Sequence, residues 1–152
     1  NYVAASLFTA ETLPSTAVKP EKRITVDGRL RLVATEMPRE VHGGVLTVNT
    51  YWEVLSKPPA DYQMFIHGDT SGNRLNGDHD PVGGKYPMRF WVPGDIVRDS
   101  YDITVSRADK AGKYKILVGF FKGDDRLKVS PKVSDNRIEI GEVWVNTRAP
   151  AK

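Results

Sequence analysis

The sequence has 152 residues, enough for one domain with a hydrophobic core, and 39% hydrophobic with 27% charged residues is ordinary for a globular chain. It contains no cysteine, which excludes disulfide bonds, thiolate catalysis and Cys-based zinc sites. The net charge of +3 suits an anionic membrane surface, an acidic polymer or simply a solvated surface, whereas no basic run with interleaved aromatic residues predicts nucleic-acid binding.

The chain divides into an arm or tether over residues 1–22, one domain over 23–147 and a short tail over 148–152. The arm has no steady hydrophobic period and could contribute one edge strand. Within the domain, a short strand is expected over Arg23–Val26, and the alternation of Leu30–Glu36 predicts a half-buried strand.

A long strand is expected over Val45–Leu55, because apolar side chains recur at every second position. Its inward face comprises Leu46, Val48, Thr50, Trp52 and Val54. Tyr51 lies in the opposite phase and is expected to point outward. The next strand, Asp61–Asp69, carries apolar residues on both faces, which is typical of a strand central in its sheet.

A long loop over Thr70–Lys85, rich in Gly and Asp, separates these strands from the second half of the domain. The later strands are predicted at Ile96–Ser106, Lys113–Phe121, Arg126–Val129 and Asn136–Val145. In the last of them the apolar phase changes around Gly141, which indicates a β-bulge. The chain therefore predicts an all-β fold, an antiparallel β-sandwich of jelly-roll type with eight or nine strands and no transmembrane segment.

Asp99 is the most unusual residue of the predicted core, because alternation places its carboxylate on an apolar strand face. A buried charge needs a partner. We expect Asp99 to be structural and to accept backbone N–H groups from the corner Trp91–Asp95, in which Gly94 is also structural. The alternative is a contact to a ligand or cation.

Aromatic residues near the loop are candidates for stacking on a sugar ring. Trp52 is expected in the core. Trp91 is either core or a ligand platform, and Tyr86 and Tyr51, both expected to point outward, are better platforms. Trp144 is either a cover over the sheet edge or an exposed platform.

Asp78, His79 and Asp80 form the one stretch that resembles a metal site, with Asp69 and His67 close enough in sequence to converge. The spacing matches neither a calcium loop nor a two-histidine site, so the alternative is a polar turn, with Asp78 and Asp80 kept as a calcium candidate. A glycosidase would need two opposed carboxylates such as Asp78 and Asp99. The sequence has no G-x-S-x-G and no phosphate-binding loop.

A succession of short motifs resembles a known family over residues 45–145. These are Trp91-Val92-Pro93-Gly94-Asp95, then Asp99-Ser100-Tyr101, and then Gly112-Lys113-Tyr114 with Val118-Gly119. They are similar to the extracytoplasmic C-terminal β-sandwich domain of bacterial membrane glycosyltransferases related to dolichyl-phosphate-mannose mannosyltransferases. The resemblance implies a non-catalytic, cofactor-free domain on the outer side of the inner membrane, with catalysis in a membrane part that this chain lacks.

The expected function is glycan binding in envelope polysaccharide assembly or protein glycosylation, with a glycan or a membrane-embedded partner as ligand. The residues assigned to binding are Tyr86, Trp91, Asp78, His79, Asp80 and Arg89. A structural or protein-interaction module without sugar binding is the alternative, and a small hydrolase is the weakest hypothesis.

Overall fold

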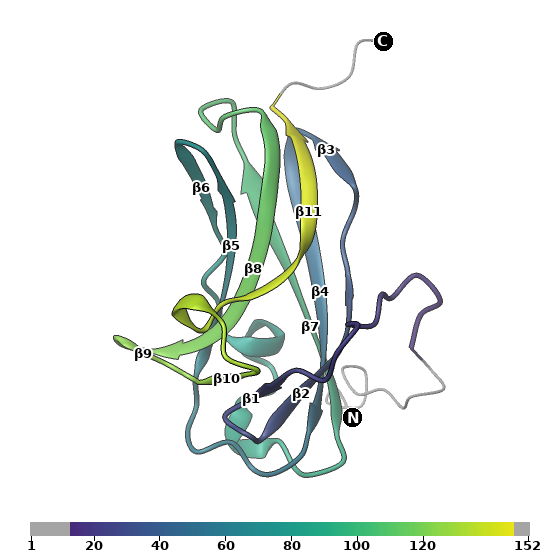
Figure 1. Cartoon of the computed structure of the whole chain (residues 1–152), viewed down its shortest axis with the longest axis vertical. Coiled ribbons are helices and arrows are strands. Elements are labelled where there is room, and N and C mark those ends of the chain that lie inside the picture. Colours follow the sequence, from purple (N-terminus) through teal and green to yellow (C-terminus); the bar gives the residue numbers. More distant parts are fainter. Residues whose placement is uncertain (1–12, 148–152) are drawn as a thin grey trace.

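Two β-sheets face each other across one hydrophobic core, so the predicted all-β sandwich is confirmed (Figure 1). The structure is a computed structural model that describes residues 13–147. Within that range no helix is long and apolar enough to cross a membrane. The helical segments described are three short 3-10 helices, η3 (Pro81–Gly84), η4 (Met88–Phe90) and η5 (Ser134–Asn136).

The first sheet has five strands, in the spatial order β10 (Val129–Ser130), β1 (Thr25–Val26), β2 (Leu30–Glu36), β4 (Gly44–Val54) and β7 (Ile96–Val105). The second has six, in the order β3 (Glu40–His42), β11 (Ile138–Asn146), β8 (Gly112–Lys122), β5 (Gln63–Thr70) and β6 (Asn73–Asn76), with β9 (Asp125–Arg126) also paired to β8. Neighbouring strands are antiparallel, except that β3 runs parallel to β11. The chain passes repeatedly from one sheet to the other, as in a jelly roll.

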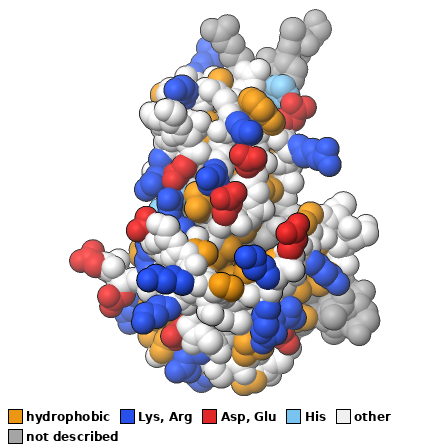
Figure 2. Space-filling view, in the orientation of Figure 1, with side chains coloured by type: hydrophobic (Ala, Val, Ile, Leu, Met, Phe, Trp, Pro, Cys, Tyr) orange, Lys and Arg blue, Asp and Glu red, His pale blue; other side chains and the backbone are white. Residues whose placement is uncertain are grey.

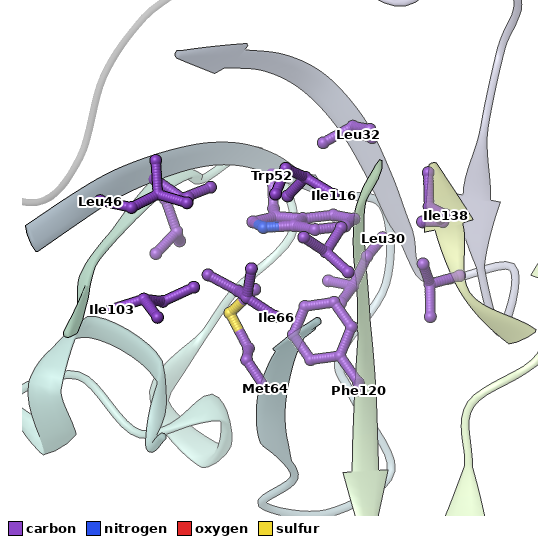
Figure 3. Packing of buried hydrophobic residues seen from close by; sticks show 14 of the residues in the cluster. Leu30, Leu32, Leu46, Trp52, Met64, Ile66, Ile103, Ile116, Phe120 and Ile138 are labelled. Atoms are coloured by element: carbon purple, nitrogen blue, oxygen red, sulfur yellow. The ribbon is translucent and has the colours of Figure 1, made fainter. Parts of the chain in front are cut away.

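The core forms where the inward positions of the long strands meet, as their alternation predicts (Figure 3). The inward residues of β4 and β8 are fully or almost fully buried, and they comprise Leu46, Val48, Thr50, Trp52, Val54, Tyr114, Ile116, Val118 and Phe120. Trp52 and Phe120 contact edge to face across the two sheets, with ring centroids 4.9 Å apart. This contact joins the sheets at the centre of the core.

The predicted β-bulge in the last strand is confirmed. The register between β11 and β8 shifts between Glu139 and Gly141. Gly141 has a φ of +146°, and a Cβ atom there would lie 2.5 Å from the end of the Met37 side chain. The bulge changes which residues of β11 face outward, and so it places Trp144 on the outer face of the second sheet.

Tyr51 does not point into solvent, and the expectation that it does is wrong. It is buried in a second small cluster with Val33, Ala34 and Ile96, on the outer face of the first sheet. Leu13 and Ala17, from the segment expected to be an arm, pack against this cluster. Alternation shows which strand face meets the other sheet, but it does not show that a remote segment covers the opposite face.

The described part of the arm pairs with the edge of β2 through one β-bridge between Val18 and Thr35, with hydrogen bonds of 2.8 and 2.9 Å. Residues 1–12 and 148–152 lie outside the described range. The eleven strands found within residues 13–147 exceed the eight or nine expected, because β3 and β6 lie in segments predicted to be connections and Arg126–Val129 is split into β9 and β10. These additional strands have only two to four residues, too few to show a hydrophobic period.

Candidate functional site

Asp99 forms a buried pair with His79, so its partners differ from those expected. His79 Nε2 lies 2.6 Å from Asp99 Oδ2, and the Val82 N–H donates to Oδ1 over 2.8 Å. The imidazole also stacks on Tyr101, with centroids 4.1 Å apart. Asp99 therefore fixes the loop around residues 77–82 to β7, rather than the corner Trp91–Asp95 as expected.

His79 is held in its charged form by acceptors at both ring nitrogens. Burial alone would lower the pKa of His79, but the Asp99 carboxylate and the Gly77 carbonyl, 2.9 Å from Nδ1, raise it above the ordinary value of 6.5. Both nitrogens then donate, which only the imidazolium can do. The side chain is buried and fully engaged, so the expectation that His79 contacts a ligand is wrong.

The His79–Asp99 pair makes stability depend on pH in a defined direction. Because the pKa of His79 is higher in the folded state, its stabilisation is complete below 6.5 and is lost as the pH rises through the raised pKa. The difference in free energy of unfolding between wild type and His79→Gln should therefore shrink as the pH rises above about 6.5, the ordinary pKa of histidine. Urea denaturation of both proteins across this range measures it, and a constant difference would contradict the charged pair.

Tyr86 and Trp91 are buried, so the expectation that they form a stacking surface is wrong. The Trp91 indole N–H donates to the Tyr86 carbonyl over 2.8 Å, and the Tyr86 hydroxyl lies 2.7 Å from Asp95 Oδ2. Asp95 Oδ2 also accepts the Val92 N–H at 3.1 Å. Gly94 has a φ of +96°, a conformation that favours glycine. These groups close the corner that leads into β7.

The remaining predicted site residues are exposed but do not form one site. Arg89 is paired with Asp61 and lines, together with Asp80, a small hollow of about 160 Å³ beside η3 and η4. Asp78 lines a different hollow, on the second sheet. Among residues 13–147, no group of three or more His, Asp or Glu side chains is placed to hold a metal ion, so the calcium candidates Asp78 and Asp80 gain no further ligands.

The outer face of the second sheet carries two larger hollows, one near each end. The first, called here the His67 hollow, has a volume of about 290 Å³. Its polar and aromatic lining comprises Phe65, His67, Asp78, Phe121, Asp124 and Arg126. These residues come from β5, β8, β9, the turn between β8 and β9, and the segment after β6, so the hollow depends on the pairing of strands distant in sequence.

Stacked side chains form one wall of the His67 hollow. The Phe65 ring lies over Gly119, where an added Cβ would approach within 2.4 Å of the ring. His67 packs against Phe65 with centroids 4.6 Å apart, and the Arg126 guanidinium lies 4.6 Å from the Phe65 centroid. The absence of a side chain at Gly119 allows this stack to lie close to the sheet.

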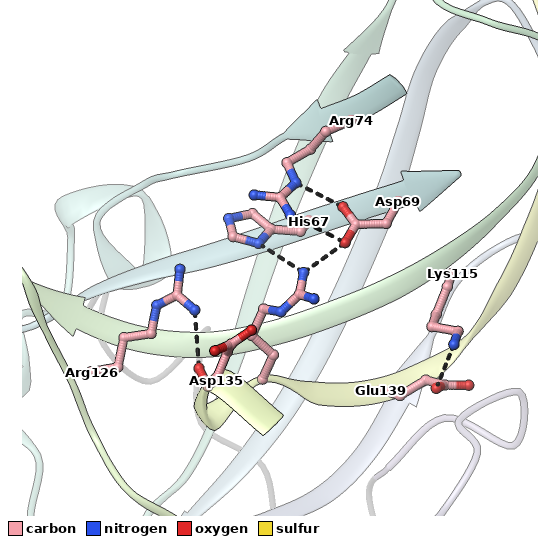
Figure 4. A network of polar contacts seen from close by, with 8 residues as sticks. His67, Asp69, Arg74, Lys115, Arg126, Asp135 and Glu139 are labelled. Carbon is pink, nitrogen blue, oxygen red and sulfur yellow. Dashed lines mark hydrogen bonds and ion pairs between the residues drawn. The ribbon is translucent and has the colours of Figure 1, made fainter. Parts of the chain in front are cut away.

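A network of arginines and one carboxylate adjoins the hollow (Figure 4). Asp69 accepts hydrogen bonds from Arg74 at 2.8 Å and from Arg137 at 2.7 Å. Burial opposes ionisation of Asp69, but these two arginines outweigh it and lower its pKa. Burial, together with the charges of Arg74 and Arg137, lowers the pKa of His67 and keeps its ring neutral near pH 7. Arg137 Nη1 lies 3.4 Å from His67 Nδ1, so Nδ1 is the acceptor and Nε2 carries the proton.

The second hollow, called here the Trp144 hollow, has a volume of about 430 Å³ at the end of the sheet where β3 lies (Figure 1). Trp144 is 58% exposed on the outer face of the second sheet. Glu40 and His42 project beside it, because β3 pairs with β11 in a register that sets Glu40 opposite Trp144 and His42 opposite Asn146. The Lys113 ammonium lies 5.8 Å from the indole centroid.

The sequence showed only part of this surface. Trp144 was recognisable by its phase in the last strand, opposite to Val143 and Val145. Glu40 and His42 lie in a segment expected to be a connection, and Asp124 and Arg126 lie around a turn, so no periodicity marked them. No protein-family model matches the chain, and the search of curated proteins finds no match either.

Proposed function

We propose that this chain is a non-catalytic accessory domain that binds glycan through the Trp144 hollow. The observation that carries the proposal is a large, exposed indole in a shallow hollow lined by hydrogen-bonding side chains. The flat face of an indole stacks on the C–H groups of a sugar ring, and polar neighbours bind its hydroxyls.

The chemistry of the neighbours supports a sugar in particular. Glu40 offers carboxylate acceptors, His42 offers a ring donor or acceptor, and Lys113 offers an ammonium at the edge of the indole. All three are exposed and project from strands. Strands hold such groups at fixed spacing, which favours recognition of a hydroxyl pattern.

The proposed setting is the outer side of a bacterial inner membrane, in envelope polysaccharide assembly or protein glycosylation. It rests on the resemblance of the motifs around Trp91–Asp95 and Asp99–Tyr101 to the extracytoplasmic domains of membrane glycosyltransferases. In that setting catalysis belongs to a membrane-embedded partner. The burial of Asp99 supports a non-catalytic role, because a substrate does not reach its carboxylate.

A glycan array that includes bacterial envelope polysaccharides tests the proposal with wild type and Trp144→Ala. Loss of a central aromatic contact should weaken binding by about 2 kcal/mol, roughly thirtyfold in affinity. Phe90→Ala is the matched control, because Phe90 is similarly exposed, at 54%, but lies on η4 outside the hollow. Equal binding by wild type and Trp144→Ala would contradict the site, and no binding by wild type would contradict the function.

One observation favours the protein-interaction alternative. Phe90 and Val92 are 54% and 51% exposed on either side of the buried Trp91, and so present two apolar side chains at one corner of the sandwich. Apolar side chains that join into a larger exposed patch mark protein interfaces. Wild-type protein that binds no glycan on the array would favour this function over glycan binding.

A further inference from the structure

We propose that the ligand is an extended, uncharged glycan that lies along β8, from the Trp144 hollow to the His67 hollow. The inference rests on the proposed function and adds a second subsite and a ligand class to it. It would exclude a single terminal sugar as the full ligand. The structural basis is that two hollows with sugar-binding chemistry lie on the same outer side of the second sheet, one near each end of β8.

The strand register shows that both hollows open on the same face. Trp144 pairs with Lys113, and paired residues of antiparallel strands point to the same side. Further along β8, Leu117 pairs with His67 and Phe121 with Gln63. Lys113, Leu117 and Phe121 are an even number of residues apart, so they share the outer side, because side chains alternate.

The His67 hollow offers the groups that a sugar ring needs. Phe121 provides a partly exposed aromatic ring, the Asp78 and Asp124 carboxylates accept hydrogen bonds from hydroxyls, and Arg126 donates them. Neutral His67 adds one donor at Nε2. Carboxylates and an arginine beside an aromatic ring suit vicinal hydroxyls better than they suit an apolar ligand.

The outer side of β8 between the two hollows, from Lys113 to Phe121, is called here the track. Its charges favour an uncharged polymer as the ligand. Lys113 is paired with Glu142 and Lys115 with Glu139, at 3.7 and 3.6 Å. Asp69 pairs with Arg74 and Arg137 in the same way. Figure 2 shows basic and acidic side chains interspersed over this face, with no large patch of one sign. A polyanion would gain little there, whereas the paired groups remain available to hydroxyls.

The track is long enough to distinguish oligosaccharides by length. Lys113 and Phe121 are eight residues apart in β8, a span of about 26 Å at about 3.3 Å per residue. A disaccharide covers one hollow only, whereas a longer chain joins the two subsites and binds with higher affinity because the second contact is intramolecular.

The experiment compares fragments of two and of six sugars, prepared from linear mannan and from (1→4)-linked glucan, by amide NMR shifts on the full chain. Disaccharides should shift signals around Trp144 alone, and hexasaccharides should also shift those of Gly123–Arg126. Asp124→Asn should weaken hexasaccharide binding about tenfold and leave disaccharide binding unchanged. Asp125→Asn is the matched control, because Asp125 is exposed next to Asp124 but does not line the hollow.

The outcomes separate this inference from the proposed function. Shifts around Trp144 with every fragment, and none near Arg126 with the hexasaccharides, would overturn the extended track and leave glycan binding in place. Tighter binding of a hexamer of galacturonate than of the neutral hexasaccharides would overturn the uncharged class. If no fragment shifts the amide signals around either hollow, both the extended track and glycan binding would be contradicted.

Discussion

Replacing Asp99 by alanine is expected to lower the free energy of unfolding by about 3–5 kcal/mol. The carboxylate is fully buried and accepts hydrogen bonds from His79 and from the Val82 backbone. Its removal leaves the imidazolium of His79 in the interior without a counter-charge, and leaves the Val82 N–H without its acceptor. Both are costly where water does not reach.

Urea denaturation at pH about 6, where His79 is charged in the folded protein, measures this loss. Asp102→Ala is the matched control on the same strand, because Asp102 is exposed and accepts one hydrogen bond, from Thr47 at 2.6 Å. The control should cost less than about 1 kcal/mol. A similar small loss for Asp99→Ala would show that the buried pair does not stabilise the fold.

Trp91→Ala is expected to destabilise the protein by about 3–5 kcal/mol, because truncation of a buried aromatic side chain leaves a cavity. Trp91 is fully buried, packs near Tyr86 with centroids 6.3 Å apart, and donates its indole N–H to the Tyr86 carbonyl. The corner before β7 would lose its packing and one hydrogen bond together. Any loss of ligand binding in this variant would therefore follow from unfolding.

Trp144→Ala provides the contrast, because the same substitution is made at an exposed tryptophan. Its free energy of unfolding should stay within about 0.5 kcal/mol of wild type. Thermal unfolding followed by circular dichroism measures both variants. If Trp91→Ala lowered the free energy of unfolding as little as Trp144→Ala is expected to, the burial of Trp91 would be contradicted. If Trp144→Ala lowered it as much as Trp91→Ala is expected to, the exposure of Trp144 would be contradicted.

The contrast between the two tryptophans also shows how far local sequence could identify a site. Trp144 lies in a strand, where alternation with Val143 and Val145 indicates the side to which each residue points. Trp91 and Tyr86 lie in a connection between β6 and β7, where no period exists to indicate direction. Their inward orientation follows from the path of the whole loop across the end of the sandwich.

The Asp99–His79 pair illustrates the same limit for a polar group. The sequence shows that Asp99 is on a buried face and must have a partner, because its neighbours at every second position are apolar. It does not identify the partner, since His79 is separated by 20 residues and by a loop that contains η3. Only the folded path of residues 77–82 decides which donor reaches the carboxylate.

By itself, the sequence determined the sandwich, the inward faces of the long strands, the bulge at Gly141 and the phase of Trp144. These features follow from alternation within one strand, which is a local property of the backbone. Tertiary structure alone decided that Tyr51 is covered by the segment around Ala17 and that Glu40 and His42 lie beside Trp144. Such contacts join segments far apart in the chain, and their geometry depends on strand order and register, which no local pattern encodes.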